Sequence, residues 1–396
     1  MGYYPDMINR NVETYIERVK KGFPIITITG PRQSGKTTLA KHLFYDLEYV
    51  SLEDPQSRQF ALNDPKGFLN RYNKGAVFDE VQRCPDLFSY LQGMVDEDQK
   101  PGRFVLTGSQ NFGLLSNITQ SLAGRTALVT LLPFSISECY RDNLPDVDKT
   151  IFTGLYPPVH DREILPEDWY PNYVQTYLER DVRQIVSVKD LNTFQTFLRL
   201  CAARTAQLLN TSSLAVECGV SHTTVKNWIS ILEASYIIFR LQPHHSNFNK
   251  RLVKSPKIYF YDTGLVAWLL SIQNISQLST HPMRGEIFET MIISEMVKSR
   301  FNQGRPSNLY FWRDYQGNEV DVIIDHGTTL IPLEIKSGKT FHPEFTKGIK
   351  KWSTLAGSLS APPVLVYGGD ESLHSSGVKV IPWNIYCKKG LSYLAP

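Results

Sequence analysis

The sequence GPRQSGKTT, from Gly30 to Thr38, directly follows the apolar run FPIITIT at residues 23–29. Its two glycines enclose four residues and are followed by a lysine and two threonines. Glycine allows backbone angles that turn successive N–H groups inward, where they can donate to phosphate oxygens. In this spacing Lys36 can reach the β- and γ-phosphates, and the Thr37 hydroxyl can bind Mg²⁺. The stretch therefore predicts a P-loop for a nucleoside triphosphate.

The residues after the loop, TTLAKHLFYDL, have the pattern of a helix. The positive N-terminal end of this helix would lie at the same phosphates. A strand, a glycine loop and a helix in succession are the context that the motif requires, and a surface glycine turn is the alternative. We predict that the following residues bind ATP: Gly30, Pro31, Arg32, Gln33, Ser34, Gly35, Lys36, Thr37 and Thr38.

A P-loop also predicts an acidic strand end downstream, and GAVFDEVQ at residues 75–82 supplies one. Asp79 would hold Mg²⁺ together with Thr37. Glu80, the next residue, would act as the general base that polarises the attacking water. A solvated turn is the alternative for an Asp-Glu pair at such a position. Together with the loop, the pair favours hydrolysis of the nucleotide.

The strand that follows, RFVLTGSQ, ends in polar residues. Either Ser109 or Gln110 could sense the γ-phosphate from there, and a plain turn is the alternative. Further on, Arg125 in SLAGRTALV could stabilise charge in the transition state, in its own site or in that of a neighbouring copy. The alternative for Arg125 is a surface ion pair.

The composition is that of an ordinary globular protein, with 42% hydrophobic and 20% charged residues among 396. A net charge of +3 neither requires nor excludes nucleic acid as a partner. The five cysteines include no CxxC pair, so a zinc site or a disulfide framework is not expected. The N-terminus lacks an apolar signal sequence, and the longest apolar run, GLVAWLLSI, is too short to span a bilayer. We therefore expect a cytoplasmic protein without a membrane partner.

The order of apolar runs and helical patterns predicts an α/β fold. Short apolar runs alternate with helices in the first third of the chain, which indicates a parallel sheet covered on both faces. The predicted segments are a P-loop ATPase core at residues 1–133, a helical connector at 134–205, a winged helix-turn-helix at 206–275 and a C-terminal α/β domain at 276–396.

Four stretches, GPRQSGKTTLA, AVFDEVQRCPDLF, FVLTGSQ and LAGRTALVTLLPFSISE, together resemble a widespread prokaryotic family of AAA-type P-loop ATPases. The resemblance extends from Val12 to about Gly368 and is most specific at the P-loop. It implies an ATP-binding core in which the strand that ends at Glu80 lies between the loop strand and a sheet edge. It further implies a winged helix, a C-terminal domain of unknown function with a restriction-endonuclease-like, PD-(D/E)xK-type pattern, and a homo-oligomer.

Residues 212–235, SSLAVECGVSHTTVKNWISILEAS, have the pattern of helix, tight turn and helix. Ser212 or Ser213 can cap the first helix, Gly219 permits the turn, and Ser221 can cap the second helix. The second helix has an apolar face and a polar face. The apolar face consists of Val225, Ile229 and Leu232 with Trp228 beside them, and the polar face of Thr223, Lys226, Asn227 and Ser230.

The segment after the second helix resembles two strands joined by a basic wing. Its basic residues could neutralise DNA phosphates, so that binding would depend on salt and show low sequence specificity. They are Lys250, Arg251, Lys254 and Lys257. The alternative is a packing or lid module of the ATPase that contacts protein.

Two C-terminal runs, NEVDVIID and LIPLEIKSG, carry a second group of charged residues. Glu334 and Lys336 are two apart on a predicted strand and project from one face, while Asp321 lies on the preceding strand. Two carboxylates and a lysine around Mg²⁺ or Mn²⁺ can activate water for phosphodiester cleavage. The pattern is similar to the D…ExK core of restriction-endonuclease-like proteins, which implies a further metal ligand from the upstream helix. Of Glu286 and Glu289 there, we favour Glu289.

Two functions are compatible with these patterns. The first is an ATP-driven enzyme that acts on DNA through the winged helix and a metal-dependent nuclease site. The second is an ATP-switched interaction protein whose nuclease-like domain is a scaffold and cuts nothing.

Overall fold

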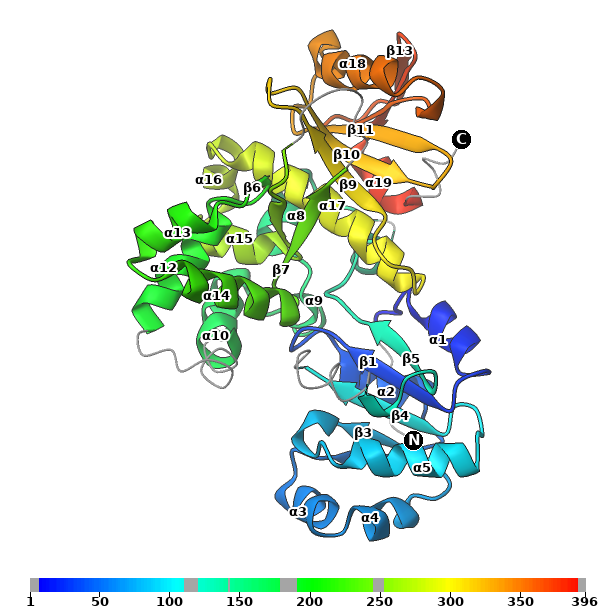
Figure 1. The fold of residues 1–396 in the computed structure, drawn as a ribbon. Coiled ribbons are helices and arrows are strands. Elements are labelled where there is room, and N and C mark those ends of the chain that lie inside the picture. Colours follow the sequence, from blue (N-terminus) through cyan, green and yellow to red (C-terminus); the bar gives the residue numbers. More distant parts are fainter. Residues whose placement is uncertain (1–6, 110–119, 142, 179–190, 245–252, 391–396) are drawn as a thin grey trace. The chain divides into compact units, whose positions relative to one another are not determined.

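The computed structural model describes residues 7–109, 120–141, 143–178, 191–244 and 253–390. The chain divides into two compact units, shown with their elements in Figure 1. The first unit consists of Met1–Phe134 with the short pieces Ala234–Tyr236 and Arg300–Arg305. The second unit consists of Ser135–Glu233, Ile237–Ser299 and Pro306–Pro396. None of the described helices is both long and apolar enough to cross a membrane.

Within the described residues of the first unit, five strands form a sheet in the order β2-β3-β4-β1-β5, and every neighbouring pair is parallel. Their bounds are β1 Ile25–Thr29, β2 Glu48–Ser51, β3 Ala76–Asp79, β4 Phe104–Gly108 and β5 Thr126–Thr130. All five lie where the apolar runs predict them. The strand before Glu80, β3, lies between β4 and the edge strand β2, as the resemblance implies.

Helices cover both faces of this sheet. They are α1 Glu13–Val19, α2 Lys36–Leu43, α3 Pro55–Asn63, α4 Pro65–Arg71 and α5 Leu87–Glu97, with a short 3₁₀ helix at Val81–Arg83. Successive strand residues point to opposite faces, so Phe78 packs in the core formed with α3, α4 and α5. Its neighbour Val77 packs in the core formed with α1 and α2. This two-sided burial explains why the inner strands β1, β3 and β4 are buried along their whole length.

The second unit begins with helices. They are α7 Ile136–Cys139, α8 Val147–Thr153, α9 Pro157–Asp161, α10 Pro166–Tyr173, α12 Leu191–Ala202, α13 Thr211–Cys218, α14 His222–Ala234, α15 Thr263–Leu269, α16 Ile275–Thr280 and α17 Arg284–Asn302, with a π-helical turn at Val174–Leu178. Helices α18 Lys347–Ala356 and α19 Trp383–Lys389 follow later in the chain, with 3₁₀ turns at Pro343–Thr346 and Gly357–Leu359.

Helices α13 and α14 form at the predicted helix-turn-helix positions. Gly219 takes the left-handed conformation with φ of 66° between them, and Ser221 Oγ accepts from the Thr224 amide at 3.0 Å. The predicted cap of the first helix was wrong. The helix starts at Thr211, so Asn210 is the N-cap and its side chain accepts from the Ser213 amide at 3.0 Å. The predicted apolar face of α14 is buried.

A sheet of nine described strands organises the rest of this unit, in the order β13-β14-β12-β11-β10-β9-β7-β8-β6. The bounds are β6 Gln207–Leu208, β7 Ile238–Pro243, β8 Lys257–Phe260, β9 Leu309–Arg313, β10 Glu319–Asp325, β11 Leu330–Lys336, β12 Val364–Tyr367, β13 Leu373–Ser375 and β14 Val378–Pro382. Strands β9, β10 and β11 are antiparallel neighbours, and β12 and β14 continue the sheet in parallel to β11.

The hairpin β7–β8 belongs to the same sheet as the C-terminal strands. Gln242 of β7 pairs in parallel with Tyr310 of β9, and Pro243 pairs with Phe311. The predicted boundary at residue 275 therefore does not separate two sheets. This pairing places β8 residues beside the C-terminal carboxylates.

Candidate functional site

The P-loop connects β1 to α2 in the first unit. Gly30 has φ of 150°, and a Cβ there would clash with the carbonyl oxygen of Leu131, so only glycine fits. Gly35, with φ of 91°, precedes the first residue of α2. The Lys36 Nζ atom donates to the carbonyl oxygens of Gly30 at 3.0 Å and Pro31 at 2.7 Å. The ammonium group of Lys36 therefore lies against the loop that the motif predicts for phosphate.

Three hydroxyl groups converge on Asp79 at the end of β3. Thr37 Oγ1 lies 3.2 Å and 3.0 Å from the two carboxylate oxygens, and the Tyr49 hydroxyl donates to Oδ2 at 2.6 Å. Thr107 at the end of β4 donates to Oδ1. Burial, followed by the hydrogen bond and charge of Asp79, raises the pKa of Tyr49. The sequence predicted that Thr37 and Asp79 hold one magnesium ion together, and it assigned no role at this site to Tyr49 or Thr107.

Glu80 leaves the strand in a left-handed conformation, with φ of 56°. Non-glycine residues adopt this region rarely and at a cost, and such residues cluster at functional sites. Its carboxylate accepts hydrogen bonds from Ser109 Oγ at 3.1 Å and from the Gln82 side-chain amide. Ser109 thus lies beside the predicted general base. Gln110, the other predicted sensor, is outside the described residues.

Arg125 directly precedes β5, which is the edge strand on the opposite side of the sheet from β2. Its carbonyl oxygen accepts from the Ile25 amide at 3.2 Å, at the start of β1, whereas the P-loop follows the end of that strand. Its guanidinium forms two hydrogen bonds with Asp96, at 2.6 Å and 2.8 Å. A part for Arg125 in its own P-loop site does not fit this position. A part in a neighbouring copy's site stays a prediction.

The residues of this site fit a nucleotide with Mg²⁺. Gly30 and Gly35 give the loop the positive φ angles that a phosphate cradle requires, and Thr37 and Asp79 supply the oxygen ligands that Mg²⁺ prefers. Ser34 Oγ is a buried polar atom without a hydrogen-bond partner in the described part of the chain. Buried hydroxyls normally have partners, so this orphan atom in the loop fits a binding site for a polar ligand.

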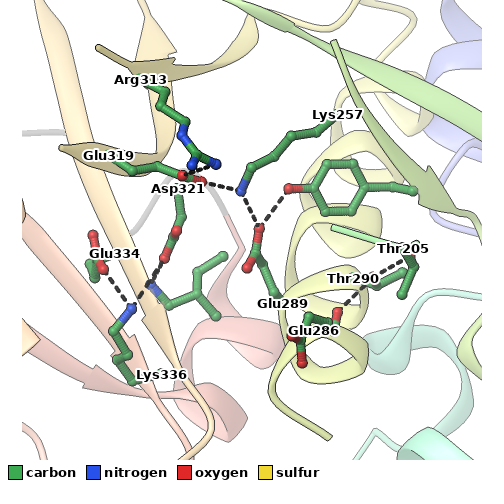
Figure 2. Close-up of polar contacts among 12 residues, drawn as sticks. Thr205, Lys257, Glu286, Glu289, Thr290, Arg313, Glu319, Asp321, Glu334 and Lys336 are labelled. Carbon is green, nitrogen blue, oxygen red and sulfur yellow. Dashed lines mark hydrogen bonds and ion pairs between the residues drawn. The ribbon is translucent and has the colours of Figure 1, made fainter. Parts of the chain in front are cut away.

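The predicted C-terminal residues gather in the second unit (Figure 2). Lys336 Nζ lies 2.5 Å from Glu334 Oε1 and 3.7 Å from Asp321 Oδ2. Asp321 Oδ2 also accepts from the Ile335 amide at 2.8 Å. The register of β10 and β11 explains this grouping, because Val322 pairs with Leu333 and the next residues along are Asp321 and Glu334. The alternation along β11 brings Lys336 to the same face.

Glu289 belongs to a second group of charges, which includes a lysine from β8. Lys257 Nζ lies 3.1 Å from Glu289 Oε1 and also pairs with Glu319, while the Tyr259 hydroxyl donates to Glu289 at 2.6 Å (Figure 2). Arg313 pairs with the other oxygen of Glu319 at 3.2 Å. Both groups border a cavity of about 650 Å³, which we call the C-terminal cleft. Its charged lining residues are Lys257, Glu286, Glu289, Arg313, Glu319 and Lys336.

Lys257 does not belong to the basic wing that was predicted from the sequence. The sequence placed it with three other basic residues on an exposed wing, but only 3% of its surface is exposed. Its position is decided by the pairing of β8 with β7 and by the pairing of β7 with β9. Lys254 is exposed as predicted, and Lys250 and Arg251 are outside the described residues.

The C-terminal cleft does not fit the predicted metal site in this arrangement. Glu289 is bound to Lys257, whereas Asp321 and Glu334 are bound to Lys336. Over the described ranges, no three His, Cys, Asp or Glu side chains are arranged to hold a metal ion. The three carboxylates predicted as metal ligands are thus divided between two lysines in the described residues. Ammonium groups balance the carboxylates instead.

Burial changes the pKa values of these groups. Burial and the neighbouring Asp321 raise the pKa of Glu334 to about 8. Burial also raises the pKa of Glu289 to about 7, although Lys257 opposes the change. Burial lowers the pKa of Lys336, but attraction by Asp321 and Glu334 outweighs it, so the pKa is raised overall. In the described structure, Glu334 Oε2 is buried without a hydrogen-bond partner.

Family models match three successive stretches of the chain. The first, described as an AAA domain, matches residues 22–140. Residues 22–140 form an AAA domain. Residues 144–276 match a domain of unknown function, DUF8612, and residues 284–386 match another, DUF4143. The P-loop and the five-stranded parallel sheet lie within the residues of the first match.

Similar proteins extend over most of the chain. Uncharacterised proteins of Mycobacterium tuberculosis and Mycobacterium bovis are each 29% identical over 365 residues, which are 91% of this chain and 80% of each relative. The Walker-type ATPase PABY2304 of Pyrococcus abyssi is 14% identical, with 67% of this chain and 97% of that chain covered and a TM-score of 0.47. AMPPCP-bound DnaA of Aquifex aeolicus is 16% identical, with 56% and 85% covered and a TM-score of 0.29.

Proposed function

We propose that the AAA domain binds ATP with Mg²⁺ and hydrolyses it. The observation that carries the proposal is the convergence of Thr37, Tyr49 and Thr107 on Asp79 beside the P-loop lysine. Thr37 and Asp79 would hold Mg²⁺, which offsets phosphate charge when it is bound. Lys36 would bind phosphate oxygens in place of the two carbonyls it now contacts.

Glu80 is the general base of this proposal. Its carboxylate would accept a proton from the attacking water. The donors Ser109 and Gln82 hold that carboxylate in one orientation at the end of β3. Because the left-handed backbone at Glu80 directs the chain away from the strand, Glu80 and Asp79 can serve water and magnesium separately.

The test compares two variants in ATP turnover and in calorimetric nucleotide binding. Lys36→Ala should lose nucleotide binding, because the Lys36 ammonium lies against the loop that would hold the phosphates. Glu80→Gln should still bind ATP but lose turnover by about 10²-fold or more. The controls are Lys66→Ala and Glu97→Gln, which change exposed residues of the same domain. Turnover at the wild-type rate in Glu80→Gln would contradict the assignment of the base.

DNA is the proposed partner of helix α14. Its exposed face contains Thr223, Lys226, Asn227 and Ser230, while its other face is buried. A single lysine on this face predicts weak, salt-dependent binding with low sequence specificity. Labelled duplex DNA should bind less tightly to Lys226→Ala than to the exposed control Lys66→Ala. Equal binding by both variants would favour the alternative, in which this module contacts protein.

For the C-terminal domain, the geometry favours a nuclease-like scaffold over an active nuclease. Lys257 and Lys336 already balance the carboxylates that a metal ion would need. The gathering of Asp321, Glu334 and Lys336 on adjacent strands is the observation that supports the nuclease alternative. In this proposal ATP binding and hydrolysis control how the chain holds DNA or a protein partner, and the C-terminal domain cuts nothing.

Cleavage assays separate the two alternatives. Wild-type protein and Lys336→Ala are incubated with Mg²⁺ or Mn²⁺ and with single-stranded, linear and branched DNA. The scaffold predicts no cleavage by either protein, together with normal ATP turnover. Metal-dependent cleavage by the wild type that Lys336→Ala abolishes would establish the nuclease instead.

A further inference from the structure

Arg10 reaches the P-loop from outside the motif. It precedes α1 and is 7% exposed. Its Nη1 atom donates to the Ser34 carbonyl at 2.8 Å, and its Nη2 atom donates to the Leu132 carbonyl at 2.7 Å. The guanidinium thus connects the loop to the chain that follows β5. We propose that Arg10 is a positioning residue that orients the P-loop for the β-phosphate of ATP or ADP, an inference that rests on the proposed nucleotide binding.

The planarity of the peptide bond explains how Arg10 would act. In a trans peptide the C=O and the following N–H point in opposite directions. With the Ser34 carbonyl held by Arg10, the Gly35 N–H must point away from Arg10. Gly35 precedes α2, and the first N–H groups of a helix have no partner within the helix. Such N–H groups of a P-loop donate to the α- and β-phosphates.

The conformation of Gly35 shows why this peptide needs support. Its φ of 91° lies in the left-handed region, where glycine moves freely between alternative backbone angles. Arg10 lies directly over it, because a Cβ built on Gly35 would be 3.6 Å from Nη1. A fixed donor beside the most permissive residue of the loop removes that freedom before the nucleotide binds. Preorganisation of this kind increases affinity.

Arg10 is itself held firmly. Val12 and Ile16 of the α1 region are completely buried in the core that also contains β1 and α2 residues. The Arg10 amide donates to Glu13 Oε1 at 2.6 Å, and its guanidinium lies 4.6 Å from the centre of the Phe134 ring. Both the backbone and the guanidinium of Arg10 are therefore fixed. An arginine suits this position because its planar guanidinium can donate to two acceptors at once.

The experiment measures ATP and ADP affinity by calorimetry for Arg10→Ala, Arg10→Lys and the control Arg18→Ala. Arg18 is exposed on α1, so its replacement removes the same charge from the neighbouring helix. Arg10→Ala should weaken ATP and ADP binding equally, each by about tenfold, because both nucleotides contain the β-phosphate. Arg10→Lys should recover part of the affinity, since an ammonium keeps the positive charge but lacks the planar pair of donors of the guanidinium. Arg18→Ala should bind as the wild type does.

Melting temperatures recorded alongside separate positioning from stability. Affinities equal to wild type in folded Arg10→Ala, with only a lower melting temperature, would overturn the inference. Loss of ATP affinity alone, with ADP binding unchanged, would overturn it too, because it indicates direct contact with the γ-phosphate. Should Arg10→Ala not fold, Arg10→Lys decides by the same comparison. Absence of nucleotide binding by the wild type would instead reject the proposed function.

Discussion

At the scale of single residues, Asp79 is the group around which the nucleotide site is arranged. Three hydroxyl donors reach it from α2, β2 and β4. Thr107→Val keeps the shape of the side chain and removes one donor. We expect ATP affinity in the presence of Mg²⁺ to fall about fivefold, while affinity in EDTA changes little. The control is Thr126→Val, which removes a hydroxyl that contacts Thr27 at the other end of the sheet. Equal losses with and without Mg²⁺ would contradict this arrangement.

Glu334 makes the stability of the protein depend on pH, because its pKa is raised from 4.5 to about 8. The folded state binds more protons than the unfolded state between these pH values, so the contribution of Glu334 to stability is lost as pH rises through this range. Glu334→Gln should therefore melt at a higher temperature than wild type at pH 8, and the difference should shrink at pH 5. The exposed Glu371→Gln serves as the control. A difference that is independent of pH would reject the raised pKa.

At the scale of elements, the hairpin β7–β8 supplies the C-terminal cleft with Lys257. Lys257→Met removes the ammonium between Glu289 and Glu319 and leaves two carboxylates with less compensation. We expect this variant to gain Mn²⁺ binding in calorimetry, and Glu289→Gln in the same background to abolish it. Lys254→Met, an exposed change in the same segment, should leave Mn²⁺ binding as in the wild type. Wild-type Mn²⁺ binding that Glu289→Gln removes would show that Lys257 does not exclude the metal.

At the scale of the whole molecule, replacing Arg125 shows whether one copy of the chain contributes to ATP hydrolysis in another. An exposed ion pair contributes little to stability, so the contact with Asp96 alone predicts equally small effects of Arg125→Ala and Asp96→Ala. If Arg125 serves a neighbouring copy, Arg125→Ala should bind ATP but lose turnover, while Asp96→Ala keeps it. The wild type should then also lose specific activity on dilution. Matching turnover in both variants would leave Arg125 as a surface residue.

Local sequence patterns were enough to predict the P-loop and the separate helices and strands of this protein. The P-loop could be predicted because its glycines and lysine act within nine consecutive residues. The five strands of the AAA domain could be predicted as short apolar runs because helices cover both faces of their sheet. The helices α13 and α14 could be predicted because the burial of one helix face imposes a period of 3.6 residues. The same period of 2 predicted that Glu334 and Lys336 share a face.

The contacts between residues far apart in the chain became known from the three-dimensional structure. Tyr49 reaches Asp79, and Arg10 reaches Ser34, across chain segments that no local pattern connects. Lys257 lies in the C-terminal cleft because β7 pairs with β9, a register that depends on residues more than sixty positions apart. The physical reason is that periodicity reports which face of an element is buried, whereas the partner of a charged side chain is set by how separate elements pair.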